Sequence, residues 1–276
     1  MKGSGDREND LMAYLYETHL HTKESSACGV SGGREYVKRY LDLGYTGIIV
    51  TDHFFRGNCA VDRKLPWETW VHRFCRGYEA AREEGTRRGL DVFLGWEETF
   101  GGDDYLVYGL GKEWLLEHPE AIRWTRKQQF EEARRYGGCV VQAHPFRQHY
   151  HINRVCLSSG CVDAVEAGNA GNYDLSYDAL AWAYAKKLNL PVTAGSDIHS
   201  ADSIHPDLVL GVYLEKRMEN IADYVTAIRN NTIQGLNVLS GRFDLWGNEK
   251  VRLPVDIRDR QDKTISRNIV KFLGLG

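Results

Sequence analysis

Apolar segments typical of buried strands alternate with segments of helical periodicity along most of this chain. In residues 33–44, for example, Tyr36, Val37, Tyr40 and Leu41 recur at helical spacing before a glycine that favours a helix end. The expected strands are residues 11–22, 45–54, 91–100, 104–111, 139–145, 162–169, 190–200 and 208–215. The expected helices are residues 33–44, 66–89, 125–136, 176–188 and 219–230.

This alternation predicts an α/β fold in which a parallel sheet is connected by crossover helices. Seven or eight such units in one chain favour a closed or nearly closed barrel over an open sheet. We expect residues 11–240 to form this barrel as a single domain. Residues 1–10 are expected to be a flexible N-terminal segment. Residues 241–276 are expected to be a C-terminal extension that is packed on the barrel or partly disordered.

The composition excludes several classes of protein. Of 276 residues, 42% are hydrophobic, and the formal net charge is −3, so no long nucleic acid is expected as a partner. No apolar run approaches the ~18 residues of a membrane span, and the polar start lacks the apolar core of a signal peptide. The six cysteines form no CxxC pair and suggest no zinc finger. A reduced, cytoplasmic protein without membrane contact is therefore expected.

Polar residues of the kinds that bind metals follow the expected strands. In an α/β barrel the carboxyl ends of the strands converge on one face, which carries the active site. These side chains should therefore meet around one pocket. They are His19, His21, Asp52, His53, Glu97, Glu98, His144, Glu166, Asn169, Asp197 and His199.

The spacing of His19 and His21 places both imidazoles on the same face of a strand, with Cα atoms roughly 6.5 Å apart. Asp197 and His199 repeat that spacing on another strand. Imidazole and carboxylate together suit zinc, manganese or iron. Each pair alone has a plainer interpretation as a local hydrogen-bonding group or a helix cap. Five strand ends that each supply such a residue favour a metal site.

The motifs "HLHT", "TDH", "GWE", "AHP" and "GSDIH", in this order, resemble those of the PHP (polymerase and histidinol phosphatase) family. The resemblance extends over roughly residues 14–215 as an ordered set of short motifs. It implies a distorted (β/α)7 TIM-like barrel that holds two or three divalent metal ions (Zn, Mn or Fe). It also implies a metal-dependent hydrolase that cleaves phosphate esters with a hydroxide bridging the metals.

The same resemblance implies roles for individual residues. The ligands of the first metal are His19, His21, Glu97 and Asp197. Glu97 also bridges to a second metal, which His144 binds, and the third metal is held by His53 and His199. Two positions depart from the family pattern. Where an aspartate or histidine often follows the first motif, Glu24 is the only strong ligand nearby, with Ser25 and Ser26 closer to the usual position. Leu106 stands where many members have a histidine, and Asp103 or Asp104 is a weaker substitute.

His53, His199 and Arg147 are the candidate catalytic residues. Either histidine could protonate the leaving group, as could an aquated metal, and the Arg147 guanidinium could clamp a phosphate. A small phosphorylated metabolite or a nucleotide is the expected substrate. Two alternatives remain open: an amidohydrolase-like enzyme that cleaves C–N bonds, and a non-catalytic metal-binding PHP module.

Overall fold

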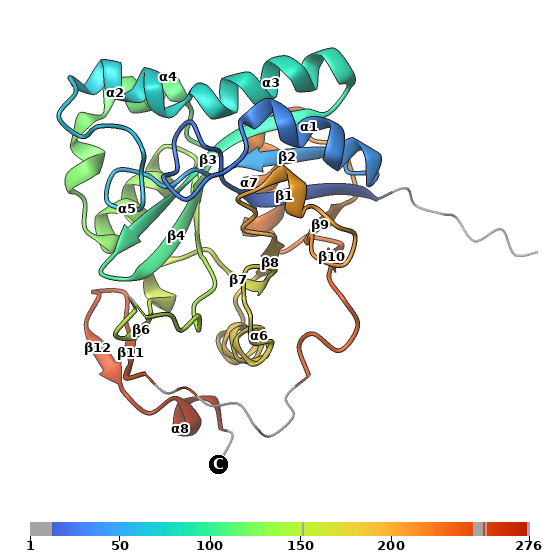
Figure 1. Cartoon of the computed structure of the whole chain (residues 1–276). Helices are drawn as coiled ribbons and strands as arrows, with labels where there is room; N and C mark the ends of the chain where they lie inside the picture. The colour runs from blue at the N-terminus through green and yellow to red at the C-terminus, as the bar shows by residue number, and fades with distance from the viewer. Residues whose placement is uncertain (1–12, 151, 245–250, 252, 275–276) are drawn as a thin grey trace, which may run out of the picture.

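The computed structural model describes residues 13–150, 152–244, 251 and 253–274 (Figure 1). The expected flexible segment at residues 1–10 lies outside the described residues. Nine strands form one sheet in the order β10-β9-β1-β2-β3-β4-β5-β7-β8. Their bounds are β1 (Tyr14–Leu20), β2 (Gly47–Val50), β3 (Asp91–Phe100), β4 (Asp103–Tyr108), β5 (Cys139–Gln142), β7 (Ala164–Asn169), β8 (Val192–Gly195), β9 (Gly211–Leu214) and β10 (Gly235–Asn237).

The sheet curls until β8, at one end of this order, returns to β1. The hydroxyl of Thr18 donates to the carbonyl of Ala194 at 2.9 Å. Beyond β8, the N–H of Asp197 donates to the carbonyl of His19 at 2.8 Å. The N–H of His21 donates to the carbonyl of Ile198 at 2.9 Å. The result is a nearly closed barrel, which confirms the fold class expected from the alternating pattern.

The predicted parallel sheet with crossover helices holds for only part of the sheet. Strand β4 is antiparallel to both β3 and β5, and β9 is antiparallel to β1. The chain passes from β3 to β4 through Gly101 and Gly102, with φ of +68° and +104°. Positive φ at both turn residues is typical of a tight hairpin, so no crossover helix separates these two strands.

Helices surround the barrel. They are α1 (Gly33–Asp42), α2 (Trp67–Phe74), α3 (Arg76–Arg88), α4 (Lys112–Glu117), α5 (Arg126–Arg135), α6 (Ser176–Leu188), α7 (Ile221–Arg229) and α8 (Ile269–Leu273). The described part of the chain also contains short 3-10 helices at Pro119–Arg123, Ser159–Cys161 and Ala201–Ser203.

The single helix expected at residues 66–89 is two helices, α2 and α3, which meet at Cys75. The hydroxyl of Ser25 donates to the carbonyl of Phe74 at 2.6 Å, at the end of α2. A side chain that enters the helical hydrogen-bond ladder is a recognised cause of a helix break. The partner lies 49 residues away in sequence, so helical periodicity alone could not show this break.

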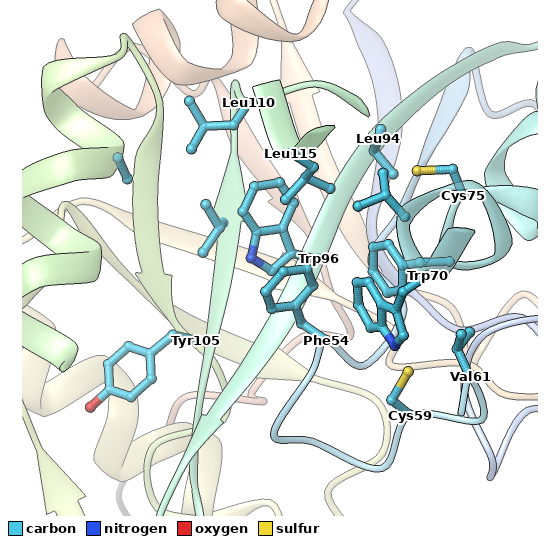
Figure 2. Close-up of a cluster of buried hydrophobic side chains, with 14 of the residues drawn as sticks. Phe54, Cys59, Val61, Trp70, Cys75, Leu94, Trp96, Tyr105, Leu110 and Leu115 are labelled. Atoms are coloured by element: carbon cyan, nitrogen blue, oxygen red, sulfur yellow. The ribbon is translucent and has the colours of Figure 1, made fainter. Parts of the chain in front are cut away.

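An aromatic cluster supports the loop after β2. The Phe54 ring stacks on Trp96 of β3, with centroids 5.3 Å apart, and meets the Trp70 and Phe74 rings edge-on at 5.2 and 5.3 Å. Figure 2 shows Phe54 beside Trp96 in this buried cluster. Since His53 is the preceding residue, this packing fixes His53 close to β3.

Part of the C-terminal region forms a second, smaller sheet. Strand β11 (Val255–Arg258) pairs in parallel with β6 (Val155–Leu157) and antiparallel with β12 (Thr264–Ser266). Figure 1 shows these strands together at one side of the barrel. Val255 and Ile257 are buried in one hydrophobic cluster with residues of β6, β7 and α6. The described part of residues 241–276 therefore packs against the rest of the chain, while the division into a barrel and an extension stays a prediction.

Among the described residues, no helix combines the length and the apolar character that crossing a membrane requires.

Gly195 is expected to be intolerant of a side chain. A Cβ at this position would lie 2.5 Å from the Cβ of His19 and 2.9 Å from Oε1 of Glu166. We expect Gly195→Ala to lower the free energy of unfolding by about 1–3 kcal/mol, the usual cost of overpacking. Urea unfolding measures this. Gly235→Ala is the control, because its added Cβ would meet its nearest atom at 3.8 Å. Equal stability of both variants would contradict the expected clash.

Candidate metal centre

The two histidines at the end of β1 are held by hydrogen bonds at Nδ1. His19 Nδ1 donates to Oε1 of Glu166 at 2.9 Å, and His21 Nδ1 donates to the Ser26 hydroxyl at 3.2 Å. Ser26 in turn donates to Asp52 at 2.7 Å, which leaves its oxygen as the acceptor for His21. Both rings thus direct Nε2 inward, and the two Nε2 atoms lie 3.1 Å apart.

Two facing ring nitrogens at this distance need a cation, a proton or a metal ion, to offset the repulsion of their lone pairs. Burial lowers the pKa of His21 well below its usual value. Burial also disfavours charge on His19, but the carboxylates of Glu166 and Asp197 raise its pKa well above the usual value. The site therefore concentrates negative charge around two ring nitrogens, which is an arrangement that attracts a cation.

Glu97 lies at the centre of the arrangement. It points from β3 into the barrel and is 1% exposed. Its Oε1 lies 3.2 Å from His144 Nε2 and 3.4 Å from His19 Nε2. Its Oε2 lies 2.7 Å from His53 Nδ1, but neither atom has a hydrogen-bond partner among the described residues. A buried carboxylate oxygen without a partner is costly, and a metal ion would satisfy it.

Asp197 approaches from the loop after β8. Its Oδ1 lies 3.0 Å from His21 Nε2 and 3.5 Å from His19 Nε2. Both Asp197 and His144 have left-handed backbone conformations, with φ of +54° and +27°. Non-glycine residues in this region cost roughly 1–3 kcal/mol and cluster at functional sites. The fold thus accepts strain to aim these two side chains.

A second donor group contains a residue that the sequence did not place among the expected ligands. Glu97, Asp104 and His144 offer ligand atoms that all lie within 4.8 Å of one another. Asp104 comes from the start of β4, two residues before Leu106, and so shares its inward face. Leu106 itself is fully buried in the core. Of the two aspartates, Asp104 is therefore the one that lies with Glu97 and His144, whereas the Asp103 carboxylate pairs with Arg126.

A third group consists of stacked imidazoles. The His21 ring stacks between His53 and His199, with centroid distances of 4.3 and 4.4 Å. Ring nitrogens of these three residues also lie within 4.8 Å of one another. His199 Nδ1 donates to the carbonyl of Asp197 at 2.8 Å, which leaves Nε2 for another ligand.

The structure does not bring Glu24 to this centre. Its carboxylate accepts a hydrogen bond from the N–H of Gly33, 3.3 Å away at the start of α1. From the same loop, Cys28 lies beside His53 and His199 instead. Burial alone would raise the pKa of the Cys28 thiol, but hydrogen bonds to these two imidazoles lower it to about 6.

Arg147 lies at the edge of the centre. Its guanidinium donates to Asp197 Oδ2 at 2.6 Å, to Asn169 Oδ1 at 2.5 Å and to Asn172 Oδ1 at 2.9 Å. Each terminal nitrogen carries a second hydrogen that these bonds do not use. The side chain is thus held in place and can still donate to a further oxygen.

Many of the candidate residues, though not His19 or His21, line one cavity of about 500 Å³. Its wall includes Cys28, His53, Glu97, Asp104, His144, Arg147, Asp197 and His199, with Arg56, Asn58, His149, Ile152 and Tyr173 among the other lining residues. Glu98, the neighbour of Glu97, faces the opposite side of β3 and pairs with Arg56 at 3.3 Å. The alternation of β3 thus sends only one of the two glutamates to the metal centre.

Comparison with known proteins gives a likeness in structure alone. No family model matches the chain, and no curated protein matches it. A two-domain protein from Bacteroides vulgatus, which contains a predicted PHP-like metal-dependent phosphoesterase, is 17% identical with a TM-score of 0.56. The match covers 80% of this chain but only 64% of that chain, so this protein spans less than two thirds of its length.

PsfC from Pseudomonas syringae is 16% identical with a TM-score of 0.51, over 84% of this chain and 93% of PsfC. An amidohydrolase from Chromobacterium violaceum is 14% identical, over 67% of this chain and 87% of that one, and its TM-score of 0.44 supports no argument. The first two structures share the fold of this chain, and the one from Bacteroides vulgatus contains the PHP-like domain that the sequence motifs imply. At these identities they show the fold alone.

Removal of one histidine at the end of β1 is expected to weaken metal binding. His19→Ala deletes a ring nitrogen shared by two of the donor groups, so affinity for divalent metal should fall at least about tenfold. Elemental analysis after dialysis against a chelator and reloading measures the change. The control is His72→Ala, which removes a half-exposed ring on α2. Unchanged metal content in the His19 variant would contradict this site.

Two neighbouring aspartates on β4 give a matched test of the second group. Asp104→Asn removes a carboxylate that faces Glu97 and His144, whereas Asp103→Asn changes one that pairs with Arg126. We expect the Asp104 variant to bind fewer metal ions per chain and the Asp103 variant to match the wild type. Titration with zinc under calorimetry distinguishes the two results. Equal loss in both variants would remove Asp104 from the ligand set.

Proposed function

We propose that this protein is a metal-dependent phosphoesterase that hydrolyses a small phosphorylated substrate. The observation that carries the proposal is the buried Glu97 carboxylate, which three imidazoles surround while one of its oxygens has no hydrogen-bond partner among the described residues. Around it the overlapping donor groups face one cavity. Such a set suits two or three divalent ions, with zinc, manganese and iron as the candidates.

The donor groups suggest which residues would hold each ion. His19, His21, Glu97 and Asp197 would hold the first. Glu97 would also contribute to the second, together with His144 and Asp104, and His53 and His199 would hold the third. When bound, such ions neutralise charge on phosphoryl oxygens and make water a nucleophile near neutral pH.

The residues of the chain would orient the substrate. Arg147 is fixed by Asp197, Asn169 and Asn172, and its free N–H groups would hold a phosphoryl oxygen in the cavity. A guanidinium suits this role because its planar fork matches phosphate geometry. We assign His53 and His199 to the leaving group, as metal ligands or proton donors, because both rings line the same cavity.

The size of the cavity supports a small substrate. At about 500 Å³ it falls within the roughly 300–1,000 Å³ of most small-molecule sites. A phosphorylated metabolite or a nucleotide fits this volume, and the net charge of −3 gives no support for long nucleic acid. A cytoplasmic location stays a prediction.

The proposal is tested by metal analysis and hydrolysis assays on one preparation. We expect two or more divalent ions per chain, and release of 4-nitrophenol from a phosphate monoester or diester after zinc, manganese or iron is added. Arg147→Lys should raise KM more than it lowers kcat, because it loses the bidentate fork but keeps the charge.

Metal binding without hydrolysis of any phosphate ester would contradict the proposal. In that case, hydrolysis of amide substrates would favour a C–N hydrolase, and its absence would favour a non-catalytic metal-binding module.

A further inference from the structure

The loop between β1 and α1 carries a thiol into the metal centre. We propose that Cys28 is a thiolate ligand of the metal ion at His53 and His199, and that it makes this position selective for zinc over manganese. This inference rests on the metal-dependent function proposed above. It adds one ligand and a preference for one metal to that function.

Backbone hydrogen bonds fix the loop on both sides of Cys28. The N–H of Ala27 donates to the carbonyl of Asn58 at 2.8 Å, in the segment that follows His53. The N–H of Val30 donates to the carbonyl of His199 at 2.7 Å. Gly29 permits this path, since a Cβ there would lie 2.5 Å from the Thr22 carbonyl oxygen. Cys28 is therefore held between the two segments that carry the histidines.

The side chain of Cys28 differs in setting from the other cysteines. All six cysteines are free, and five of them are buried. Cys28 is partly exposed and lines the same cavity as His53 and His199. A structural cysteine is commonly buried, as the other five are. The Cys28 thiol instead lies where it can bind a metal ion in the cavity.

The neighbouring polar atoms point independently to a cation at this place. Glu97 is 1% exposed, and its Oε2 lies 2.7 Å from His53 Nδ1, yet neither atom has a hydrogen-bond partner among the described residues. His199 Nδ1 donates to the carbonyl of Asp197, which leaves Nε2 as the ring nitrogen for a metal ion. A buried ring nitrogen and a buried carboxylate oxygen thus meet without a hydrogen bond, and a cation beside them would satisfy both.

The donor types decide which cation is preferred. One thiolate with two imidazoles is a ligand set that zinc binds well, with a fourth position open to a water or substrate oxygen. Manganese and magnesium prefer oxygen ligands. The carboxylate that could have served a hard ion here, Glu24, is turned toward Gly33. The loop between β1 and α1 therefore supplies a sulfur ligand to this metal position, whereas the other two metal positions have carboxylate ligands.

Cobalt substitution tests the proposal without relying on catalysis. Loading the full-length protein with Co²⁺ should produce the intense near-ultraviolet charge-transfer absorption of a thiolate–cobalt bond. We expect Cys28→Ser to lose this absorption and Cys59→Ala, at a buried cysteine in the aromatic cluster, to retain it. Absence of the band in the wild type, or its persistence in Cys28→Ser, would overturn the proposal.

Two further measurements use the same proteins. Zinc should slow alkylation of Cys28 by iodoacetamide at least about tenfold, the scale of effect seen when a metal site loses a supporting group. Cys28→Asp should shift the preference of the third ion toward manganese. Unprotected alkylation in the zinc-loaded protein would count against the thiolate. A cobalt–thiolate band without hydrolysis would refute the proposed function alone, and hydrolysis without the band would refute only the Cys28 ligand.

Discussion

The Glu97 carboxylate is 1% exposed, and ring nitrogens of His19, His53 and His144 lie within 3.4 Å of its oxygens. Burial of a lone carboxylate costs several kcal/mol, so this residue needs positive charge close by. Burial tends to raise the pKa of Glu97, but His19 and His53 hold it well below the usual value. Each of these imidazoles follows or ends a different strand, so the closure of the barrel and the charge balance of its centre depend on each other.

The backbone around Glu97 reinforces this dependence. Its N–H donates to the carbonyl of Asp52 at 3.0 Å, and its carbonyl accepts from the N–H of Phe54 at 2.7 Å. The chain is thus tied to β3 on both sides of His53, while the Phe54 ring is held in the aromatic cluster shown in Figure 2. The apolar packing outside the barrel fixes the position of a polar side chain within it.

Much of the barrel could be predicted from the sequence, because strand-end polar residues and helical periodicity are local patterns. The sequence also predicted that one group of side chains would meet, and the geometry is consistent with this. The group is His19, His21, Glu97, His144 and Asp197. The antiparallel β4 was not predicted, although the glycine pair before it is a hairpin signal. Asp104 and Cys28 were harder to predict. The register of the β3–β4 hairpin places Asp104 at the centre. Backbone hydrogen bonds from the residues near Cys28 to Asn58 and His199 place Cys28 there.

The direction of β4 has a consequence for how the centre could change. Most of the candidate ligands leave the ends of parallel strands, but Asp104 enters at the beginning of an antiparallel one. Its inward orientation follows from the register of β4 against β3 and β5, in which Asp104 pairs with Thr99 beside a two-glycine turn. Because strand residues alternate between faces, a one-residue shift of that register would direct Asp104 outward and its neighbour inward. The number of metal ions proposed for the barrel thus depends on the register of one hairpin, which can change without any substitution of a ligand.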